Sequence, residues 1–191
     1  MTNQPDEYYI EQTLNGNVNY YAFLVERYQQ MVFTLTIRIV KNREVAEEIS
    51  QDVFVKAYEN LERFKGESKF STWIYKIAYY ASLDTIKRNK RQLNFENIET
   101  INEINFEKVQ DALQSLQDKE RKIIINNALF KLSEDERVIL TLFYFEEMSI
   151  KEISKVVNLS LDNIKIKLFR SRKKLASILK NVIDPQTINL R

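Results

Sequence analysis

The chain has 191 residues, with 29 lysines and arginines against 27 aspartates and glutamates, and a formal net charge of +2. It contains no cysteine and no histidine, which excludes disulfides, thiol nucleophiles, zinc sites built on these residues and histidine-based acid–base catalysis. We therefore expect no enzymatic activity, no metal and no cofactor. No apolar run approaches the roughly 18 residues that a membrane span requires, and the first residues do not form a signal peptide. A cytoplasmic protein without membrane insertion is predicted.

Glycine and proline are scarce, at two residues each, so the chain lacks the residues that hairpins and tight turns need. This scarcity favours an all-α fold of long helices with short polar connections. Between residues 92 and 120, apolar periodicity is weak and acidic residues dominate, which is typical of a flexible tether. We therefore predict two small helical domains, 18–91 and 121–180, joined by a flexible acidic linker over 92–120.

The first domain is predicted to contain three helices, near Tyr20–Val40, Glu44–Leu61 and Ser71–Asn89. The second of these has one apolar side, formed by Ala46, Ile49, Val53, Ala57 and Leu61. Its opposite side carries Glu48, Gln51, Asp52, Val55 and Glu59. Periodicity alone favours a solvated face for this side, and Val55 in its middle is the one hint of a contact surface.

A polar loop bracketed by two phenylalanines, Phe64–Phe70, precedes the third helix and holds Gly66, one of only two glycines. The two rings are expected to anchor the loop to the core and to leave residues 65–69 exposed. A loop held at both ends is either a plain surface loop or a rigid pocket for an extruded base. In the second case, contacts in the pocket must offset the few kcal/mol that base flipping costs.

The third helix is apolar nearly all round, which is typical of the central helix of a small bundle. Trp73, Ile74, Ile77 and Ala81 are therefore assigned to the core. The cations of this helix and of its basic end are instead candidates for contact with a DNA backbone: Lys76, Lys87, Arg88, Lys90 and Arg91.

The second domain shows two helix starts with Ser-x-x-Glu spacing, Ser133–Glu136 and Ser149–Glu152. After the second of these helices, Asn158 suits a left-handed turn and Ser160 can cap the helix that follows. Two helices joined by a short turn, of which the second is basic, are typical of a helix-turn-helix.

On the last helix, the buried side is predicted to consist of Ile164, Leu168, Ser171, Leu175 and Ile178. The opposite side presents Ile166, Phe169, Arg170 and Lys173, flanked by Lys165 and Arg172 on one edge and by Lys167 and Lys174 on the other. Basic flanks suit the phosphates on either side of a major groove, and apolar groups between them can contact thymine methyls. The alternative is that Phe169 packs on the preceding helix.

Two blocks of the sequence resemble one protein family, in the family's order. Gln51–Arg91 resembles the promoter-melting domain of bacterial sigma factors of the sigma-70 family, in particular the extracytoplasmic-function (ECF) group. Leu132–Leu175 resembles the −35-reading domain of the same family. Its Met148–Ser154 stands where the family typically has Leu-Ser-x-x-Glu-Ile-Ala, and Asp162–Arg172 where it has Gly-Thr-Val-Lys-Ser-Arg-Leu-x-Arg-Ala-Arg. Departures from the family pattern occur at Tyr80, Glu147, Asp162, Asn163 and Ile166.

The resemblance implies a sigma factor that binds the β and β′ subunits of core RNA polymerase, reads −35 and −10 promoter elements and melts the −10 region. It also implies an anti-sigma factor as a further partner, and a linker that threads through channels of the polymerase. The residues implied to bind core polymerase are Glu48, Gln51, Asp52 and Val55. Those implied to bind −10 DNA are Phe64, Lys65, Gly66, Ser68, Lys69, Phe70, Ser71, Thr72, Lys76, Tyr80, Lys87 and Arg88. Those implied to bind −35 DNA are Ser160, Lys165, Ile166, Lys167, Phe169, Arg170 and Lys173.

Two other functions remain open at the level of sequence. A free-standing helix-turn-helix regulator, with the first domain as an oligomerising or ligand-sensing bundle, explains residues 133–175 equally well but does not predict the loop that holds Gly66. An enzyme or recombinase with a DNA-binding tail is disfavoured by the lack of histidine and of a recognisable catalytic constellation.

Overall fold

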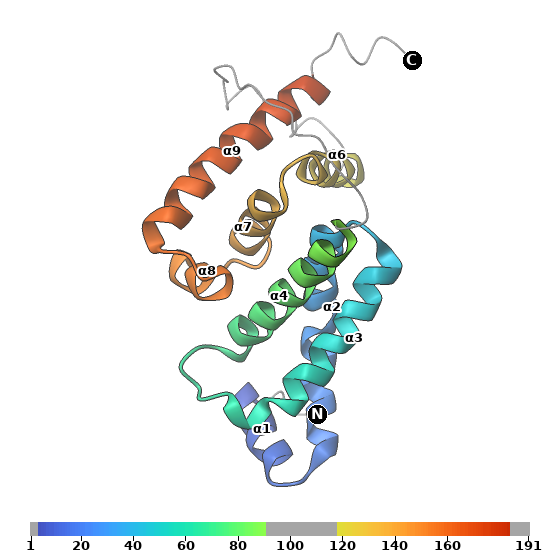
Figure 1. Ribbon diagram of the computed structural model, residues 1–191, viewed down its shortest axis with the longest axis vertical. Helices are drawn as coiled ribbons and strands as arrows, with labels where there is room; N and C mark the ends of the chain where they lie inside the picture. The colour runs from blue at the N-terminus through green and yellow to red at the C-terminus, as the bar shows by residue number, and fades with distance from the viewer. Residues whose placement is uncertain (1–3, 91–117, 184–191) are drawn as a thin grey trace.

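The computed structural model describes residues 4–90 and 118–183, and every regular element within these ranges is a helix (Figure 1). The N-terminal bundle comprises α1 (Asp6–Leu14), η1 (Val18–Tyr20), α2 (Tyr21–Val40), α3 (Arg43–Glu59), η2 (Leu61–Arg63) and α4 (Phe70–Lys90). The C-terminal bundle comprises α6 (Asp118–Phe130), α7 (Glu134–Tyr144), α8 (Ile150–Val157) and α9 (Leu161–Ile183). The predicted all-α fold is confirmed. The predicted linker lies outside the described residues up to residue 117, and α6 begins inside its last three positions.

The three helices predicted for the first domain are present, with ends that differ from the prediction by at most two residues. Local chemistry explains where they stop and start. Lys41 ends α2 in the left-handed conformation, with φ 59°. Asn42 caps α3, because its side-chain oxygen accepts a hydrogen bond of 3.0 Å from the backbone N–H of Val45.

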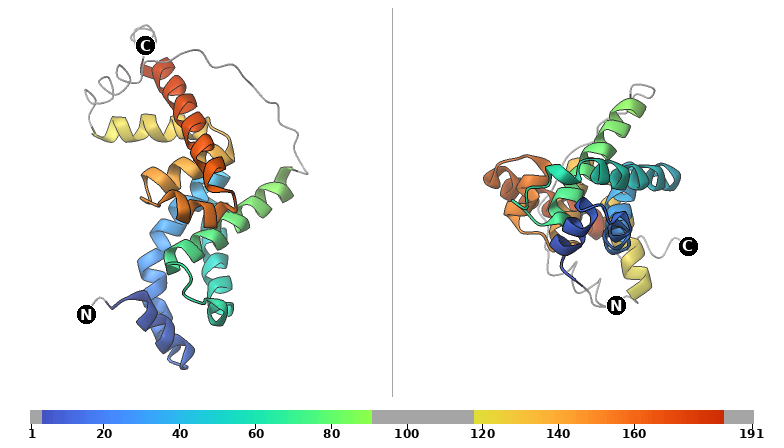
Figure 2. Two further views of the ribbon diagram at one scale, coloured as in Figure 1. Left: turned by 90° about the vertical axis from the view of Figure 1, so that its left-hand side faces the viewer. Right: turned by 90° about the horizontal axis from the view of Figure 1, so that it is seen from below.

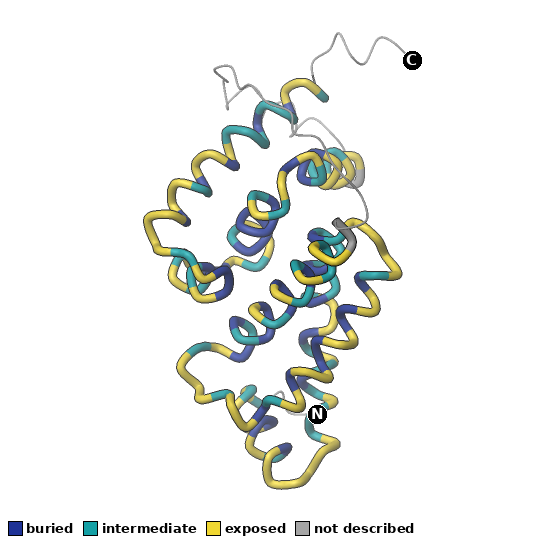
Figure 3. The backbone as a smooth tube through the Cα atoms, viewed as in Figure 1, coloured by how far each residue is buried: buried dark blue, intermediate teal, exposed yellow. Residues whose placement is uncertain are grey.

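Helices α2, α3 and α4 pack against one another and enclose the core of the N-terminal bundle. The predicted apolar side is confirmed, since Ala46, Ile49, Val53 and Ala57 of α3 and Leu61 of the following η2 are all buried. In Figure 3 the inward faces of these helices are buried, whereas the outward face of α3 is exposed along its length.

Helix α1 is an element that the sequence reasoning missed. It packs against α2, where the Asp6 carboxylate accepts hydrogen bonds from the Arg27 guanidinium and the Tyr28 hydroxyl. The available signal was Pro5 followed by Asp6 and Glu7, an extended residue and two acids in a first helical turn.

The two bundles pack against each other, which the sequence analysis did not predict. Helix α8 lies along α4 and helix α7 lies against α2, and the views in Figures 1 and 2 agree on this contact. A single cluster of buried apolar side chains runs through both bundles. The described part of the chain is therefore one packed unit in this structure.

Candidate nucleic-acid interface

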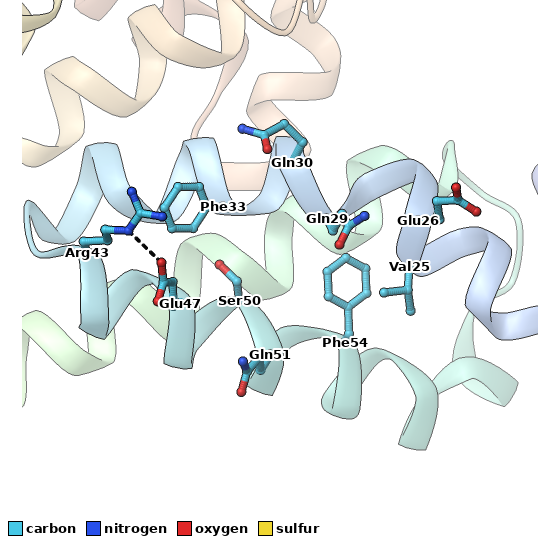
Figure 4. A pocket seen from close by; sticks show the side chains of 10 residues that line it. All are labelled: Val25, Glu26, Gln29, Gln30, Phe33, Arg43, Glu47, Ser50, Gln51 and Phe54. Atoms are coloured by element: carbon cyan, nitrogen blue, oxygen red, sulfur yellow. Dashed lines mark hydrogen bonds and ion pairs between the residues drawn. The ribbon is translucent and has the colours of Figure 1, made fainter.

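The outward face of α3 presents the four residues that the sequence analysis grouped for polymerase binding. Glu48, Gln51 and Asp52 are exposed, and Val55 has 56% of its surface accessible although it is apolar. Beside this face, a groove of about 600 Å³ runs between α2 and α3 (Figure 4). Its lining residues are Val25, Glu26, Gln29, Gln30, Phe33, Arg43, Glu47, Ser50, Gln51 and Phe54. The face therefore joins exposed polar groups to a hollowed, partly aromatic surface.

The Phe64–Phe70 loop is anchored as predicted. The rings of Phe64, Phe70 and Trp73 touch one another, with centroids 5.3 to 5.7 Å apart. Gly66 has φ 69°, a conformation that glycine adopts without the steric cost that a Cβ would bring. Lys65, Gly66 and Lys69 are exposed, whereas Ser68 and Ser71 are half-buried. The cluster of three aromatic rings therefore supports a short polar loop that faces solvent.

Two residues grouped with the −10 site have a different place in this structure. Phe70 and Thr72 are only 1% and 3% exposed, and within the described part of the chain the Thr72 hydroxyl has no hydrogen-bond partner. Both side chains point into the bundle because they occupy the first turn of α4, where it packs on the core. In this arrangement they support the loop instead of reaching an external ligand.

A hollow of about 440 Å³ lies between α3 and α4. It is lined by Lys56, Trp73, Lys76, Ile77, Tyr80, Ala81 and Asp84. The assignment of Trp73, Ile77 and Ala81 to the core was therefore only partly right, since these residues are half-buried and line an accessible surface. Tyr80 is 38% exposed and Lys76 is exposed, so aromatic and cationic groups meet here. Such a combination suits stacking of an unpaired base beside a phosphate.

The basic end of α4 continues the same side of the bundle. Lys87 and Arg88 are exposed, and the Arg88 guanidinium donates a hydrogen bond of 3.2 Å to the Thr85 hydroxyl. The cations thus follow the hollow on the same helix, and its last lining residue, Asp84, is about one turn before Lys87 and Arg88.

The helix-turn-helix is formed by α8 and α9. The Glu152 carboxylate accepts hydrogen bonds from the backbone N–H and the hydroxyl of Ser149, so the predicted capping box is present. Asn158 adopts the left-handed conformation, with φ 55° and ψ 48°. Ser160 then accepts a hydrogen bond of 3.3 Å from the backbone N–H of Asn163 at the start of α9. The turn therefore follows the predicted chemistry at each step.

The two sides of α9 also agree with the sequence pattern. Ile164, Leu168 and Ser171 are buried and Leu175 and Ile178 are half-buried, whereas Ile166 is 49% and Phe169 is 64% exposed. The alternative in which Phe169 packs on the preceding helix is therefore wrong. Figure 3 shows the exposed face of α9 turned away from the rest of the molecule.

Several cations of α9 are already paired with acidic groups. Lys165 lies 3.0 Å from Asp162 on the same helix, and Lys167 lies 3.2 Å from Asp135 of α7. The two remaining edge cations are also engaged, Lys174 with Glu136 at 3.1 Å and Arg172 with the Tyr144 hydroxyl at 3.2 Å. Phosphates that bind this face must compete with these partners. The pairing across helices was missed, because Asp135 lies 32 positions from Lys167 in the sequence.

Comparison with known proteins agrees with this arrangement of surfaces. The family model for sigma-70 region 2 matches residues 24–92, and the model for sigma-70 region 4 matches residues 124–175. The chain belongs to the sigma-70 family. Because region 2 accounts for most of the N-terminal bundle, the free-standing regulator is not favoured. The chain is a sigma factor of the ECF group, a protein that directs core RNA polymerase to promoters.

Curated relatives extend the similarity over nearly the whole chain. The ECF RNA polymerase sigma factor SigW of Bacillus subtilis is 29% identical over 182 residues, which are 91% of this chain and 96% of SigW. The RNA polymerase sigma-H factor of Pseudomonas aeruginosa is 26% identical over 190 residues, 96% of this chain and 98% of that protein. The ECF RNA polymerase sigma-E factor of Escherichia coli K12 is 27% identical over 174 residues, 88% of this chain and 91% of that factor.

Solved structures share the fold of this sigma factor. CnrH, solved in complex with the cytosolic domain of CnrY, has a TM-score of 0.68 and 20% identity, and the match covers 93% of this chain and 99% of CnrH. The sigma factor RpoE of Bartonella quintana, solved with the anti-sigma factor NepR, has a TM-score of 0.64 and 18% identity, covering 82% of this chain and 94% of RpoE.

Two further observations concern the described residues alone. Across residues 4–90 and 118–183, no helix has the length and apolar character needed to cross a membrane. In the same ranges, no three acidic side chains come together as ligands for a metal ion.

Proposed function

We propose that the N-terminal bundle of this sigma factor, within the predicted domain 18–91, supplies both polymerase docking and −10 recognition. Glu48, Gln51, Asp52 and Val55 dock core polymerase. The observation that carries this assignment is the contrast across α3, where one side is completely buried and the other is open, polar and carries an exposed valine. An exposed apolar side chain amid charged ones is what the centre of a docking surface requires.

The −10 site in this proposal consists of the exposed part of the Phe64–Phe70 loop together with the hollow lined by Trp73, Lys76 and Tyr80. An extruded base would stack against aromatic groups there while the lysine neutralises a phosphate. Lys87 and Arg88 extend the path of the backbone along α4. Tyr80 stands at a departure from the family pattern, so it is our candidate for setting the preferred base.

The C-terminal bundle, within the predicted domain 121–180, reads the −35 element through the outer face of α9. Ile166 and Phe169 contact thymine methyls, while Lys165, Lys167, Arg170 and Lys173 contact phosphates or base edges. Ser160 at the helix start adds a backbone contact. The exposure of Phe169 supports this role, because removing the apolar ring from water by burying it against DNA lowers the free energy of the complex.

The rest of the proposal concerns partners and setting. The linker, residues 92–120, follows the polymerase channels, and the chain acts in the cytoplasm without a cofactor and without covalent chemistry of its own. CnrH and RpoE were solved with protein partners. We extend that behaviour to this chain and infer an anti-sigma factor as its regulator.

A titration of core RNA polymerase with the purified chain, without DNA, tests the docking assignment. We expect one-to-one binding that Asp52→Arg weakens by at least about tenfold, since charge reversal at a docking site leaves like charges facing each other. Glu11→Arg is the matched control, because Glu11 is an exposed acid on α1, outside the proposed surface. If both variants bind polymerase as the wild-type chain does, docking on this face of α3 is wrong.

A further inference from the structure

The outer side of α9 carries two neighbouring apolar side chains in the middle of a basic surface. Ile166 and Phe169, which we call the apolar pair, are both exposed and lie three positions apart, so they are neighbours on the helix surface. Arg170 and Lys173 lie on the same side of the helix. Single exposed apolar side chains are ordinary, whereas neighbouring ones on a charged surface indicate a contact site. The cations around the pair indicate an anionic partner, which agrees with the assignment of this face to −35 DNA.

This face offers hydrogen-bond donors but no acceptors. From Lys165 to Lys174, every exposed or half-buried side chain outside the apolar pair belongs to lysine or arginine, which only donate. The Ser171 hydroxyl is fully buried, and Asp162, at the start of the helix, is paired with Lys165 at 3.0 Å. The stretch contains no amide side chain to read adenine and no acid to read the amino group of cytosine. It can therefore bind acceptor atoms and apolar groups of the bases.

The apolar group that a base edge presents in the major groove is the C5-methyl group of thymine. The side chains of isoleucine and phenylalanine have no polar atom, so they distinguish bases only through this methyl group. Ile166 departs from the family pattern, which has serine at this position. A serine hydroxyl can contact several base edges, because it both donates and accepts. Isoleucine in its place therefore restricts the base that is read here.

The spacing of the apolar pair suits two neighbouring base pairs. Three positions on an α-helix correspond to about 4.5 Å along its axis, close to the roughly 3.4 Å between successive bases of one DNA strand. Ile166 and Phe169 can therefore meet two methyl groups at the same time, while the cations beside them contact phosphates.

We propose that α9 recognises the −35 element through the C5-methyl groups of pyrimidines in two neighbouring base pairs, and that it binds 5-methylcytosine there as it binds thymine. This inference rests on the proposed function of α9 and names what that reader detects. 5-Methylcytosine carries the same methyl group but has an amino group where thymine has O4, a difference that the apolar pair does not sense. Its partner guanine offers O6 and N7 to the donors of Arg170. Cytosine methylation within a −35 element thus strengthens binding.

Removal of single methyl groups from the DNA tests the first part. A −35 duplex is selected from a pool of random sequences with the full chain, and each thymine is then replaced in turn by uracil, which lacks only the methyl group. We expect two neighbouring positions at which uracil weakens binding by about fourfold, the factor for one buried group of this size. Uracil at the other positions should leave the affinity unchanged. Fluorescence anisotropy measures each dissociation constant.

Variants of the chain assign the two methyl groups to their side chains. In Ile166→Ser one of the two uracil effects should disappear, and in Phe169→Ala the other should, because the methyl group then has no apolar partner to lose. The matched control is Ile123→Ser, the same change at an exposed isoleucine of α6. It should leave both uracil effects in place.

The second part is tested at the base pair that Ile166 reads. Replacement of its T·A pair by C·G should weaken binding by the wild-type chain. 5-Methylcytosine at the same position should bind about fourfold more tightly than cytosine, because one methyl group is again buried. In Ile166→Ser, cytosine and 5-methylcytosine should bind equally.

The possible outcomes separate this inference from the proposed function. Uracil without effect at every position, or uracil effects that persist in both Ile166→Ser and Phe169→Ala, overturn methyl recognition. 5-Methylcytosine that binds the wild-type chain no better than cytosine overturns the response to methylation. If the pool yields no preferred duplex, the −35 assignment of α9 itself fails. A preferred duplex that is bound without regard to its methyl groups leaves that assignment standing and refutes only this inference.

Discussion

The outer face of α9 makes a quantitative prediction about salt. Four cations assigned to DNA, Lys165, Lys167, Arg170 and Lys173, lie on the exposed side or edges of this helix. Each phosphate contact contributes about −0.9 to the slope of log affinity against log salt, so four contacts give a slope of about −3.6. Raising the salt from about 50 to about 200 mM should therefore weaken binding to a −35 duplex by about 150-fold.

Arg170→Ala is the most direct perturbation of that slope. Arg170 is exposed, whereas Lys165 and Lys167 are held in ion pairs within the protein. Removing one phosphate contact should reduce the slope to about −2.7, so that the same change in salt weakens binding by only about 40-fold. The assay is fluorescence anisotropy of a labelled duplex at five or more salt concentrations. The duplex is first selected from a pool of sequences, because the preferred −35 sequence must be found.

The matched control for Arg170→Ala is Lys180→Ala. Lys180 is an exposed cation of the same helix, about 15 Å further along it and beyond the region 4 match. Its removal should leave the slope unchanged. An unaltered slope in Arg170→Ala, or an equal reduction in both variants, would show that the DNA-facing side of α9 has been assigned incorrectly.

Three further predictions follow from individual contacts. Asp135→Asn frees Lys167 and should tighten duplex binding by about two- to fivefold in the same anisotropy assay, the worth of an exposed ion pair; weaker binding would contradict it. The folded-state pKa of Glu152, about 2, lies below its unfolded value, so the stability that this carboxylate adds should be fully present above about pH 5 and lost as the pH falls toward 2. In urea unfolding, the free energy of unfolding of the wild-type chain should exceed that of Glu152→Gln by a smaller amount as the pH falls from about 5 toward 2. A difference between the two free energies that is constant with pH would refute the lowered pKa of Glu152. Gly66→Ala should cost about 1 kcal/mol in the same measurement, because φ 69° strains a residue with a Cβ although the space around the loop is open; Ser68→Ala in the same loop should cost less.

Much of this protein was determined by chemistry within a few residues of each position. The helix starts at Ser133 and Ser149, the left-handed turn at Asn158 and the cap at Ser160 each depend on neighbours at most four positions away, and all were predicted correctly. The two faces of α9 follow from the 3.6-residue period, which places residues three or four apart on the same side. The same period predicted the buried stripe of α3.

Tertiary packing decided everything that depends on residues far apart in the chain. Trp73 lines a hollow and Thr72 is buried because of the helices that α4 packs against. The apolar pattern of α4 is nearly uniform, so it does not distinguish the sides of α4 that meet other helices from the side that lines the hollow. The pairing of Lys167 with Asp135 and the hold of Lys155 on the Phe64–Phe70 loop join segments that are 32 or more positions apart. Periodicity orders side chains around one helix but does not specify which helix they meet. The sequence therefore determined which surfaces this sigma factor possesses, and the packing of the two bundles decided which of them are open.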